Sequence, residues 1–162
     1  MPEVWRLMDI AFARAEGLAM RLFRNSDLNS LSRDMLEIFL KESGLPTIQQ
    51  AEIMAAPDKT KLYIKALRIG DLNTAQNARV AFYNSLEGNG IFLQKQFYDQ
   101  FSEIHGLIVS AFVEQQLALD YTGTTDYKAF AALQKDGKKK KDQLLLDIRA
   151  RLWSSASHVL PV

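Results

Sequence analysis

Apolar residues recur along most of the chain at steps of three and four residues, the spacing that places them on one face of an α-helix. The first such stretch runs from Pro2 to about Asn25, and Pro2 suits the first turn of a helix. Its inner face carries Trp5, Met8, Phe12, Ala15, Ala19 and Phe23. No segment shows convincing period-two alternation, so we predict helices and no strand.

Two shorter helices are predicted next. The first ends at Gly44, ahead of Pro46, because glycine relieves the left-handed stop position and proline prevents continuation. The second follows Thr47, which forms a capping-box pattern with Gln50, each side chain satisfying a backbone N–H. The first of these helices is predicted to face inward with Leu31, Met35, Ile38 and Phe39.

A long helix is predicted from Pro57 to Leu86. Gly70 is the weak point, because glycine costs about 1 kcal/mol inside a helix and Asp71 could cap a new one. We predict a continuous or mildly kinked helix. Its face with seven-residue spacing carries Leu62, Ile69, Gln76 and Tyr83, interleaved with Ala66, Asn73 and Val80.

The stretch LEGNGIFLQKQFYDQF at 86–101 joins that helix to the next one. Gly88 and Gly90 let the chain reverse without a Cβ penalty, and Ile91, Phe92 and Leu93 are predicted to pack back as a hydrophobic staple. The helix that follows has an inner stripe of Phe97, Phe101, Ile104, Ile108, Ala111, Gln115 and Leu119. A neighbouring stripe carries Tyr98, His105, Phe112 and Leu119.

A final helical segment runs from about Thr125 to Ser155, although Asp136 and Gly137 interrupt it and its continuity stays open. At 1.5 Å per residue it is about 45 Å long, close to the helix before it, which favours antiparallel neighbours. Its apolar positions are Tyr127, Phe130, Leu133, Leu144, Leu145, Ile148 and Leu152. We therefore predict an all-α, single-domain antiparallel bundle over 1–155, with three long helices, one or two short ones and a flexible tail at 156–162.

The composition excludes several classes of protein. A chain of 162 residues that is 48% hydrophobic and 24% charged suits one soluble domain with one core. A net charge of +1 gives no global field for nucleic acid or membranes, and the lack of cysteine excludes disulfides and thiolate metal sites. No apolar run approaches the ~20 residues that span a bilayer, and the N-terminus lacks a secretory pattern, so the cytoplasm is the default location.

The order of FYNSLEGNGIFL, QKQFYDQFSEIHGLIVSAF and a last amphipathic helix, from about Lys59 to Leu152, resembles uncharacterised bacterial helical domains. Those domains carry an Asn-x-Ile-Phe-Leu turn between long antiparallel helices. Here Gln94 and Lys95 stand where a proline usually follows the turn. The resemblance implies the architecture and transfers no activity and no functional residue.

Catalytic and metal chemistry find little support. His105 follows Ser102 and Asp99 at three-residue steps, but three residues descending one helix cannot easily converge as a triad with an oxyanion site. We predict instead a partly buried histidine with satisfied hydrogen bonds. The chain has no Glu-x-x-His motif, which a ferritin-like di-iron site in a bundle requires. We therefore expect no enzyme, no metal and no other cofactor.

Aromatic and amide side chains are ambiguous between core and site. Packing is the preferred interpretation for the aromatic set, because a bundle interior requires large apolar side chains at helical spacing. This set is Phe82, Tyr83, Phe92, Phe97, Tyr98, Phe101 and Phe112. The amides Asn73, Gln76 and Gln115 either set the pairing between helices or mark where the stripe reaches the surface.

Lysines form the clearest charge clusters, and several lysines can bind phosphates of nucleic acid or anionic lipid without specificity. The possible basic patch consists of Lys59, Lys61, Lys65, Lys138, Lys139, Lys140 and Lys141. Residues 47–70 have the size of a helix-turn-helix but lack the glycine usual at its turn. We expect a non-enzymatic helical module that binds another protein or itself, as a homo-oligomer; the alternative is nucleic-acid binding through the lysines.

Overall fold

The computed structural model describes residues 1–20, 27–120 and 127–156, and their regular structure is entirely helical. The α-helices are α1 (Pro2–Met20), α2 (Arg33–Glu42), α3 (Thr47–Ala55), α4 (Lys59–Asn89), α5 (Lys95–Asp120), α6 (Lys128–Ala132) and α7 (Lys138–Ala156). Short 3-10 turns lie at η1 (Leu28–Ser30) and η2 (Gly90–Phe92), and η3 (Leu133–Gly137) is a π turn. The all-α prediction is confirmed. The predicted end of the first helix, the start near Thr125 and residues 157–162 of the predicted tail lie outside the described residues, whereas Ala156, assigned to that tail, is the last residue of α7.

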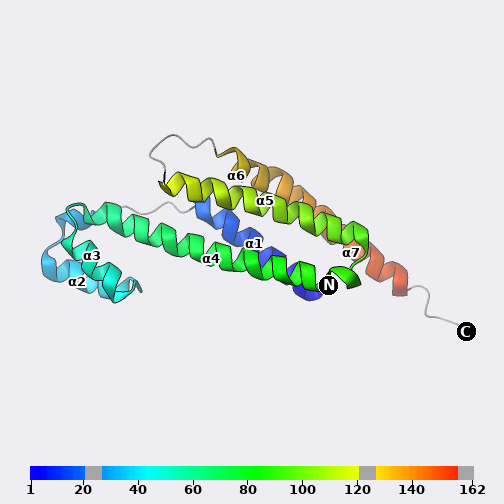
Figure 1. The fold of residues 1–162 in the computed structure, drawn as a ribbon, viewed down its shortest axis with the longest axis horizontal. Coiled ribbons are helices and arrows are strands. Elements are labelled where there is room, and N and C mark those ends of the chain that lie inside the picture. Colours follow the sequence, from blue (N-terminus) through cyan, green and yellow to red (C-terminus); the bar gives the residue numbers. More distant parts are fainter. Residues whose placement is uncertain (21–26, 121–126, 157–162) are drawn as a thin grey trace, which may run out of the picture.

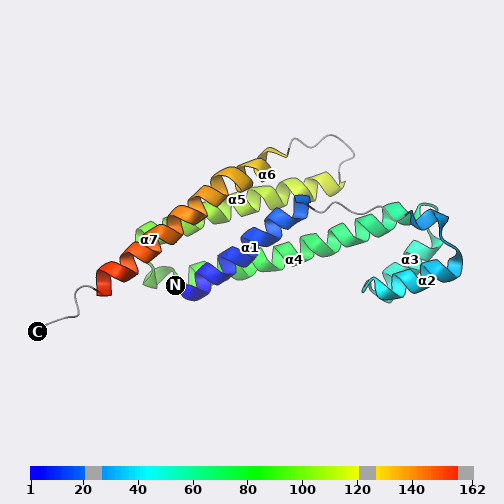
Figure 2. The same cartoon turned by 180° about the vertical axis from the view of Figure 1, so that it is seen from behind.

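Four long elements form an elongated bundle of two layers (Figures 1 and 2). α4 and α5 make one layer, and α1 with α6–α7 makes the other. α5 runs antiparallel to α4 and to α7, and α1 runs antiparallel to α4. α4 is longer than α1, and its overhanging N-terminal end carries α2 and α3 (Figure 1). Within the described ranges, no helix is both long and apolar enough to cross a bilayer.

The main core lies between the two layers. Phe97, Phe101, Ile104 and Ile108 of α5 are each at most 1% exposed, which confirms the inner stripe predicted for this helix. Gln115 and Leu119 at its end are half-buried. The partners of α5 in this core come from α1, α4, η3 and α7: Val4, Met8, Ala11, Phe12, Ala15, Phe82, Leu86, Leu133 and Leu144.

The predicted inner face of α4 is correct at Ala66, which is buried, but towards the C-terminal end of the helix it is displaced by one position from the face observed. Phe82 and Leu86 are buried, whereas Tyr83 is 45% exposed and Val80 is 38% exposed. Successive residues of a helix lie about 100° apart, so two adjacent apolar stripes compete for the interior. Phe82 occupies the side that faces both α1 and α5, and Tyr83 is left on the flank.

The predicted inner face of α2 is half right: Leu31 and Phe39 pack against its neighbours, but Met35 and Ile38 do not. Leu36 and Leu40 are buried, while Met35 and Ile38 are 60% and 59% exposed. α2 packs on α3 and on the overhang of α4 with the side that bears Leu36, Phe39 and Leu40, and the Phe39 ring meets Tyr63 of α4 edge-on at 5.3 Å. This contact makes a second core cluster, separate from the main core, from Leu28, Leu36, Leu40, Ile53 and Ala66.

Side-chain hydrogen bonds connect η1 to the start of α4. Asp58 caps α4 by accepting from the backbone N–H of Lys61, and Asn29 accepts from the N–H of Lys59 at 2.8 Å. Thr60 Oγ1 accepts from the N–H of Leu28 at 2.9 Å. These bonds orient the α2–α3 unit on the end of α4.

The capping box predicted at Thr47 is wrong. The residue preceding α3 is Pro46, and no side chain caps the helix. Gln50 does not bond back to the start of α3; its Nε2 donates to the carbonyl of Leu45 at 2.6 Å. Because Thr47 already belongs to the first helical turn, its hydroxyl is one position too late to act as the cap.

The two doubtful glycines have different outcomes. α4 continues through Gly70 without a break, as predicted. Gly137 closes the π turn η3, in which the helix accommodates an extra residue before α7 begins. Gly137 is buried against the ring of Phe12, so the absence of a side chain allows α1 to approach the turn.

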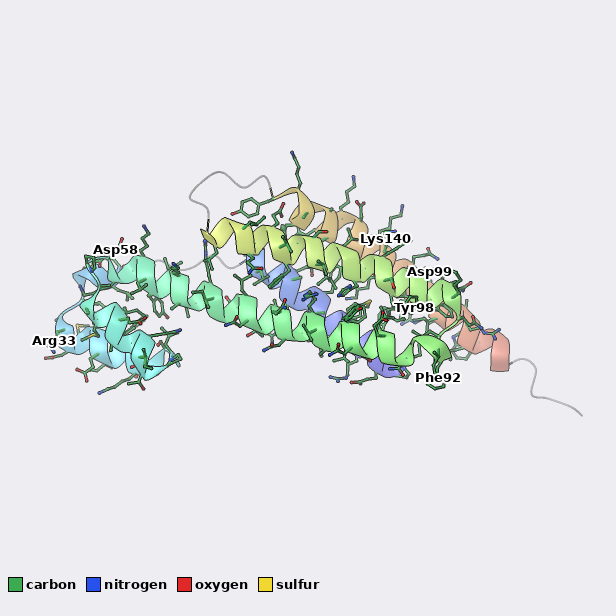
Figure 3. All side chains as sticks on the ribbon, in the orientation of Figure 1. Arg33, Asp58, Phe92, Tyr98, Asp99 and Lys140 are labelled. Carbon is green, nitrogen blue, oxygen red and sulfur yellow. The ribbon has the colours of Figure 1, made fainter. Side chains whose placement is uncertain are left out.

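The turn between α4 and α5 leaves apolar side chains in solvent. Ile91 is 86% exposed and Phe92 is 79% exposed, and Phe92 points away from the bundle (Figure 3). Only Leu93 packs against the main core. The predicted hydrophobic staple is therefore wrong for Ile91 and Phe92, because the η2 turn directs both residues outward before α5 begins.

Candidate functional site: the outer seam of α4 and α5

The surface where α4 and α5 meet, on the side away from α1 and α7, is the richest candidate site. We call it the outer seam. No helix of the described chain covers it (Figure 1). Its contacts and its groove involve Gln76, Arg79, Tyr83 and Glu87 of α4, and Tyr98, His105, Phe112 and Gln116 of α5. We include in it the exposed Val80 and Val113, which follow Arg79 and Phe112 along the two helices.

His105 lies at the middle of the seam between aromatic rings. Its ring stacks on Tyr83 at a centroid distance of 5.2 Å and meets Phe82 edge-on at 5.6 Å. Burial lowers the pKa of His105, and the positive charge of Arg79 lowers it further, while Glu87 opposes both. His105 is partly buried as predicted, but its Nε2 is buried without a hydrogen-bond partner, so the prediction of a satisfied imidazole is wrong.

Two contacts between α4 and α5 flank His105, one on each side. Towards the turn, Tyr98 donates its hydroxyl to Glu87 Oε1 at 2.7 Å, and this bond raises the pKa of Tyr98. In the other direction, the Arg79 guanidinium lies over the ring of Phe112 at 5.9 Å. The formal charges of Arg79 and Glu87 offset each other, so the seam is close to neutral.

Beyond Phe112 the seam opens into a groove of about 300 Å³. The groove has no charged side chain in its lining, which consists of Ile69, Leu72, Asn73, Gln76, Phe112, Gln116 and Leu119. Gln76 accepts from Arg79 Nε at 3.1 Å, and Asn73 is exposed. A neutral groove with amides among aliphatic side chains suits another protein surface better than an ionic substrate.

The three amides do not pair helices with one another. Gln76 bonds within α4, Asn73 is at the surface, and Gln115 Nε2 is buried without a partner. The structure therefore favours the second interpretation of Asn73, as a residue that marks where the stripe reaches solvent. Gln115 has no role that the structure explains.

The side chains considered for a catalytic triad are not joined. Asp99 accepts from Lys95 Nζ at 2.6 Å, and neither Asp99 nor Ser102 hydrogen-bonds to His105. Among the described residues there is no group of three or more His, Asp or Glu side chains that could hold a metal ion. The aromatic set divides between core and seam: Phe82, Phe97 and Phe101 are buried, whereas Tyr83 and Phe92 are exposed.

The seven lysines do not form one patch. Lys59, Lys61 and Lys65 follow Asp58 at the α2–α3 end of the molecule, whereas Lys140 lies on the four-helix part (Figure 3). Lys140 and Lys141 form ion pairs with Glu103 and Asp9, and Lys141 also lies over the ring of Phe12 at 5.2 Å. Lys138 and Lys139 remain exposed.

The α3–α4 segment, which has the size of a helix-turn-helix, is not a separate two-helix unit. Its second helix, α4, is 31 residues long and packs along most of its length on other helices of the chain. No known protein family, curated protein or solved structure shows a significant match to this chain.

The sequence identified most members of the seam but placed them in the core. Tyr83, Gln76 and Val80 belong to the seven-residue pattern of α4, and Tyr98, His105 and Phe112 form the neighbouring stripe of α5. The useful signal was the presence of two parallel apolar stripes on each helix, because only one stripe of each can face the interior. Arg79 was missed, since an arginine on a helix flank carries no distinctive pattern.

Proposed function

We propose that this chain is a non-enzymatic helical interaction module that associates with a second copy of itself through the outer seam. The observation that carries the proposal is the uncovered seam, in which Val80, Tyr83 and Val113 are 38%, 45% and 44% exposed beside a neutral groove. Apolar surface that monomers leave uncovered is typical of sites of association. The proposal assigns no reaction and no cofactor, and a cytoplasmic location is part of it.

A second copy fits the seam because two seams can face each other without a charge penalty. Within each seam the opposite charges of Arg79 and Glu87 offset each other, so the contact between two seams carries no net charge. Two helices on each side would then complete a four-helix contact, in which the self-complementary surface is typical of a two-fold dimer. A partner protein with a similar helical pair is the other occupant that such a surface could accept.

Light scattering coupled to gel filtration tests this proposal. The wild-type chain is expected to have about twice the 18.4 kDa mass of the monomer at micromolar concentration. The double variant Val80→Arg/Val113→Arg places two charges of the same sign in each seam and is expected to be monomeric. Circular dichroism should show unchanged helix content, because both side chains are exposed in the single chain.

The matched control is Met35→Arg, which places the same new charge at a 60% exposed position of α2, outside the seam. This variant is expected to keep the dimer mass. A monomeric wild-type chain would contradict the proposal. The proposal would also be contradicted if Met35→Arg abolished the dimer while Val80→Arg/Val113→Arg left it intact. The contact between the two copies would then lie on the α2–α3 unit.

Nucleic-acid binding is the weaker candidate. Its two lysine groups lie in different parts of the molecule, and two of the four lysines at 138–141 are engaged in ion pairs. A single continuous phosphate-binding surface is therefore not supported by their arrangement.

A further inference from the structure

The outer surface of α7 combines positive charge with exposed apolar side chains, and self-association through the seam makes no use of it. Residues 128–153 contain eight lysines and arginines against three aspartates, a net charge of +5, while the whole chain has a net charge of +1. The rest of the molecule is therefore net negative, and the positive charge is concentrated on the continuous segment of α6, η3 and α7. Such asymmetry is typical of a surface that meets an anionic partner.

Some basic residues of α7 form ion pairs within the bundle and others do not. Lys140 and Lys141 point towards the neighbouring helices and pair with Glu103 and Asp9. Lys138, Lys139 and Arg149 are exposed and form no ion pair with a described residue. Asp142 is the acid that lies among them.

Two large apolar side chains share this outer surface. Lys139, Leu146 and Trp153 follow one another at intervals of seven residues, so they lie along one line of α7, about 21 Å long. Leu146 is 57% exposed and Trp153 is 74% exposed, although the inner side of α7 already buries Leu144 in the core. We call Lys138, Lys139, Leu146, Arg149 and Trp153 the α7 stripe.

We propose that the α7 stripe binds the surface of an anionic lipid bilayer, with Lys138, Lys139 and Arg149 on lipid headgroups and Leu146 and Trp153 inserted between them. Tryptophan is favoured at the boundary between headgroups and acyl chains, and basic residues are attracted by the negative potential of acidic lipids. A second copy is disfavoured on this surface, because two strongly positive elements would face each other.

Nucleic acid would use the same lysines but not the same apolar residues. Phosphate contacts come from charged and polar groups, and an aliphatic side chain such as Leu146 at the centre of the contact would add nothing to them. The α7 stripe is also a single exposed helix face, and no groove that could hold a nucleic-acid strand lies beside it in the described chain. The combination of Leu146 with Trp153 therefore favours a bilayer.

Vesicle sedimentation tests the proposal with the full chain. Vesicles of phosphatidylcholine mixed with phosphatidylserine are expected to bind the protein, and vesicles of phosphatidylcholine alone are not. Raising the salt concentration should weaken the binding, because ions screen the charges of the exposed lysines. The Trp5→Phe variant leaves Trp153 as the single tryptophan, and its emission should shift to shorter wavelength on the anionic vesicles.

Matched variants locate the contact. Lys138→Glu/Lys139→Glu should weaken vesicle binding by about tenfold or more, because each basic residue near an anionic surface adds to the attraction. Lys61→Glu/Lys65→Glu changes the net charge equally at the other end of the molecule and should leave binding within about twofold. Trp153→Ala keeps the charge and should also weaken binding, since it removes the inserted ring.

Three outcomes would overturn the proposal. The first is no binding to anionic vesicles. The second is an equal loss in the two lysine variants, which would show a general charge effect. The third is binding of duplex DNA or single-stranded RNA that depends on Lys138 and Lys139, with no binding to vesicles, which would assign the α7 stripe to nucleic acid. None of these results depends on whether the chain dimerises, so the proposed function is tested separately.

Discussion

Gly137 lies in the π turn η3 directly against the ring of Phe12. A Cβ atom at this position would be 2.9 Å from Phe12 Cε2 and 3.2 Å from Leu133 Cδ1, and both neighbours are buried in the main core. Gly137→Ala is therefore expected to lower the free energy of unfolding by about 1 kcal/mol, because overpacking outweighs the better helix propensity of alanine. Urea unfolding monitored by circular dichroism measures this change.

Gly70 provides the matched control in α4, since it is also a helical glycine but is exposed and has nothing within 4 Å of the added Cβ. Gly70→Ala should raise the free energy of unfolding, by up to about 1 kcal/mol. If both variants changed stability in the same direction, packing against Phe12 would not be the reason for glycine at position 137.

His105 predicts a dependence of stability on pH. Its pKa in the folded chain is lowered by burial and by Arg79, so the unfolded chain binds the proton more readily. The neutral form stabilises the fold above the unfolded pKa of about 6.5, and this contribution is lost as pH falls through the lower pKa of the folded state. Free energies of unfolding measured from about pH 7.5 to pH 5.5 should decrease.

The variant His105→Gln should remove most of this dependence, while a His158→Gln control should keep it. An unchanged pH profile in His105→Gln would exclude His105 as the cause. The half-buried state of His105 was predictable from its stripe, because a histidine between Tyr98 and Phe112 must flank the core. Its unpartnered Nε2 was not predictable, since hydrogen-bond satisfaction depends on residues of α4 that the sequence of α5 does not identify.

α6 begins at a cap supplied by another helix. Glu114 of α5 accepts from the backbone N–H groups of Ala129 and Phe130, each at 2.9 Å, one bond to each carboxylate oxygen. Tyr127, just before α6, has a left-handed φ of 46° and makes no side-chain cap. The start of α6 therefore depends on α5, because no local side chain satisfies these two N–H groups.

Glu114→Ala is expected to lower the free energy of unfolding by about 1–2 kcal/mol, because two charge-assisted hydrogen bonds to helix N–H groups are lost. Hydrogen exchange at Ala129 and Phe130 should become faster. Glu103→Ala removes an acid whose ion pair with Lys140 is exposed, and should cost less than about 1 kcal/mol. Equal losses in the two variants would contradict a special role of Glu114 as the cap.

Whether the sequence predicts the buried face of a helix correctly depends on which neighbours the helix packs against. α5 packs on α1, α4 and α7 with one broad apolar face, and its sequence identified that face correctly. α4 contacts different partners along its length and α2 has a short contact, so each carries two candidate stripes and the pattern could not choose between them. The phase errors at Tyr83 and Met35 follow from this ambiguity.

The prediction of a single core missed the second cluster because the sequence does not show how the helices are offset along one another. The sequence shows helices of suitable length but not that α4 extends past α1, and this overhang carries α2 and α3 on a cluster of their own (Figure 2). The outer seam and the α7 stripe have a different cause. A helix with two apolar stripes can bury only one of them in a bundle of two layers, so the other stripe stays exposed to solvent.

Because the molecule has two separate core clusters, we predict that one cluster can unfold locally while the other stays folded. Leu40 is 1% exposed in the α2–α3 cluster, and Leu40→Ala removes packing worth about 2–5 kcal/mol at such positions. Because the cluster contacts only the overhang of α4, amides of α2 and α3 should exchange faster through local opening, while those of α5 keep their protection.

Ile104→Ala, at a fully buried position of the main core, should instead increase exchange in α1, α4 and α5 together. Hydrogen exchange followed by mass spectrometry separates the two patterns, and faster exchange of α5 in Leu40→Ala would mean that the continuous helix α4 couples both clusters into one cooperative unit.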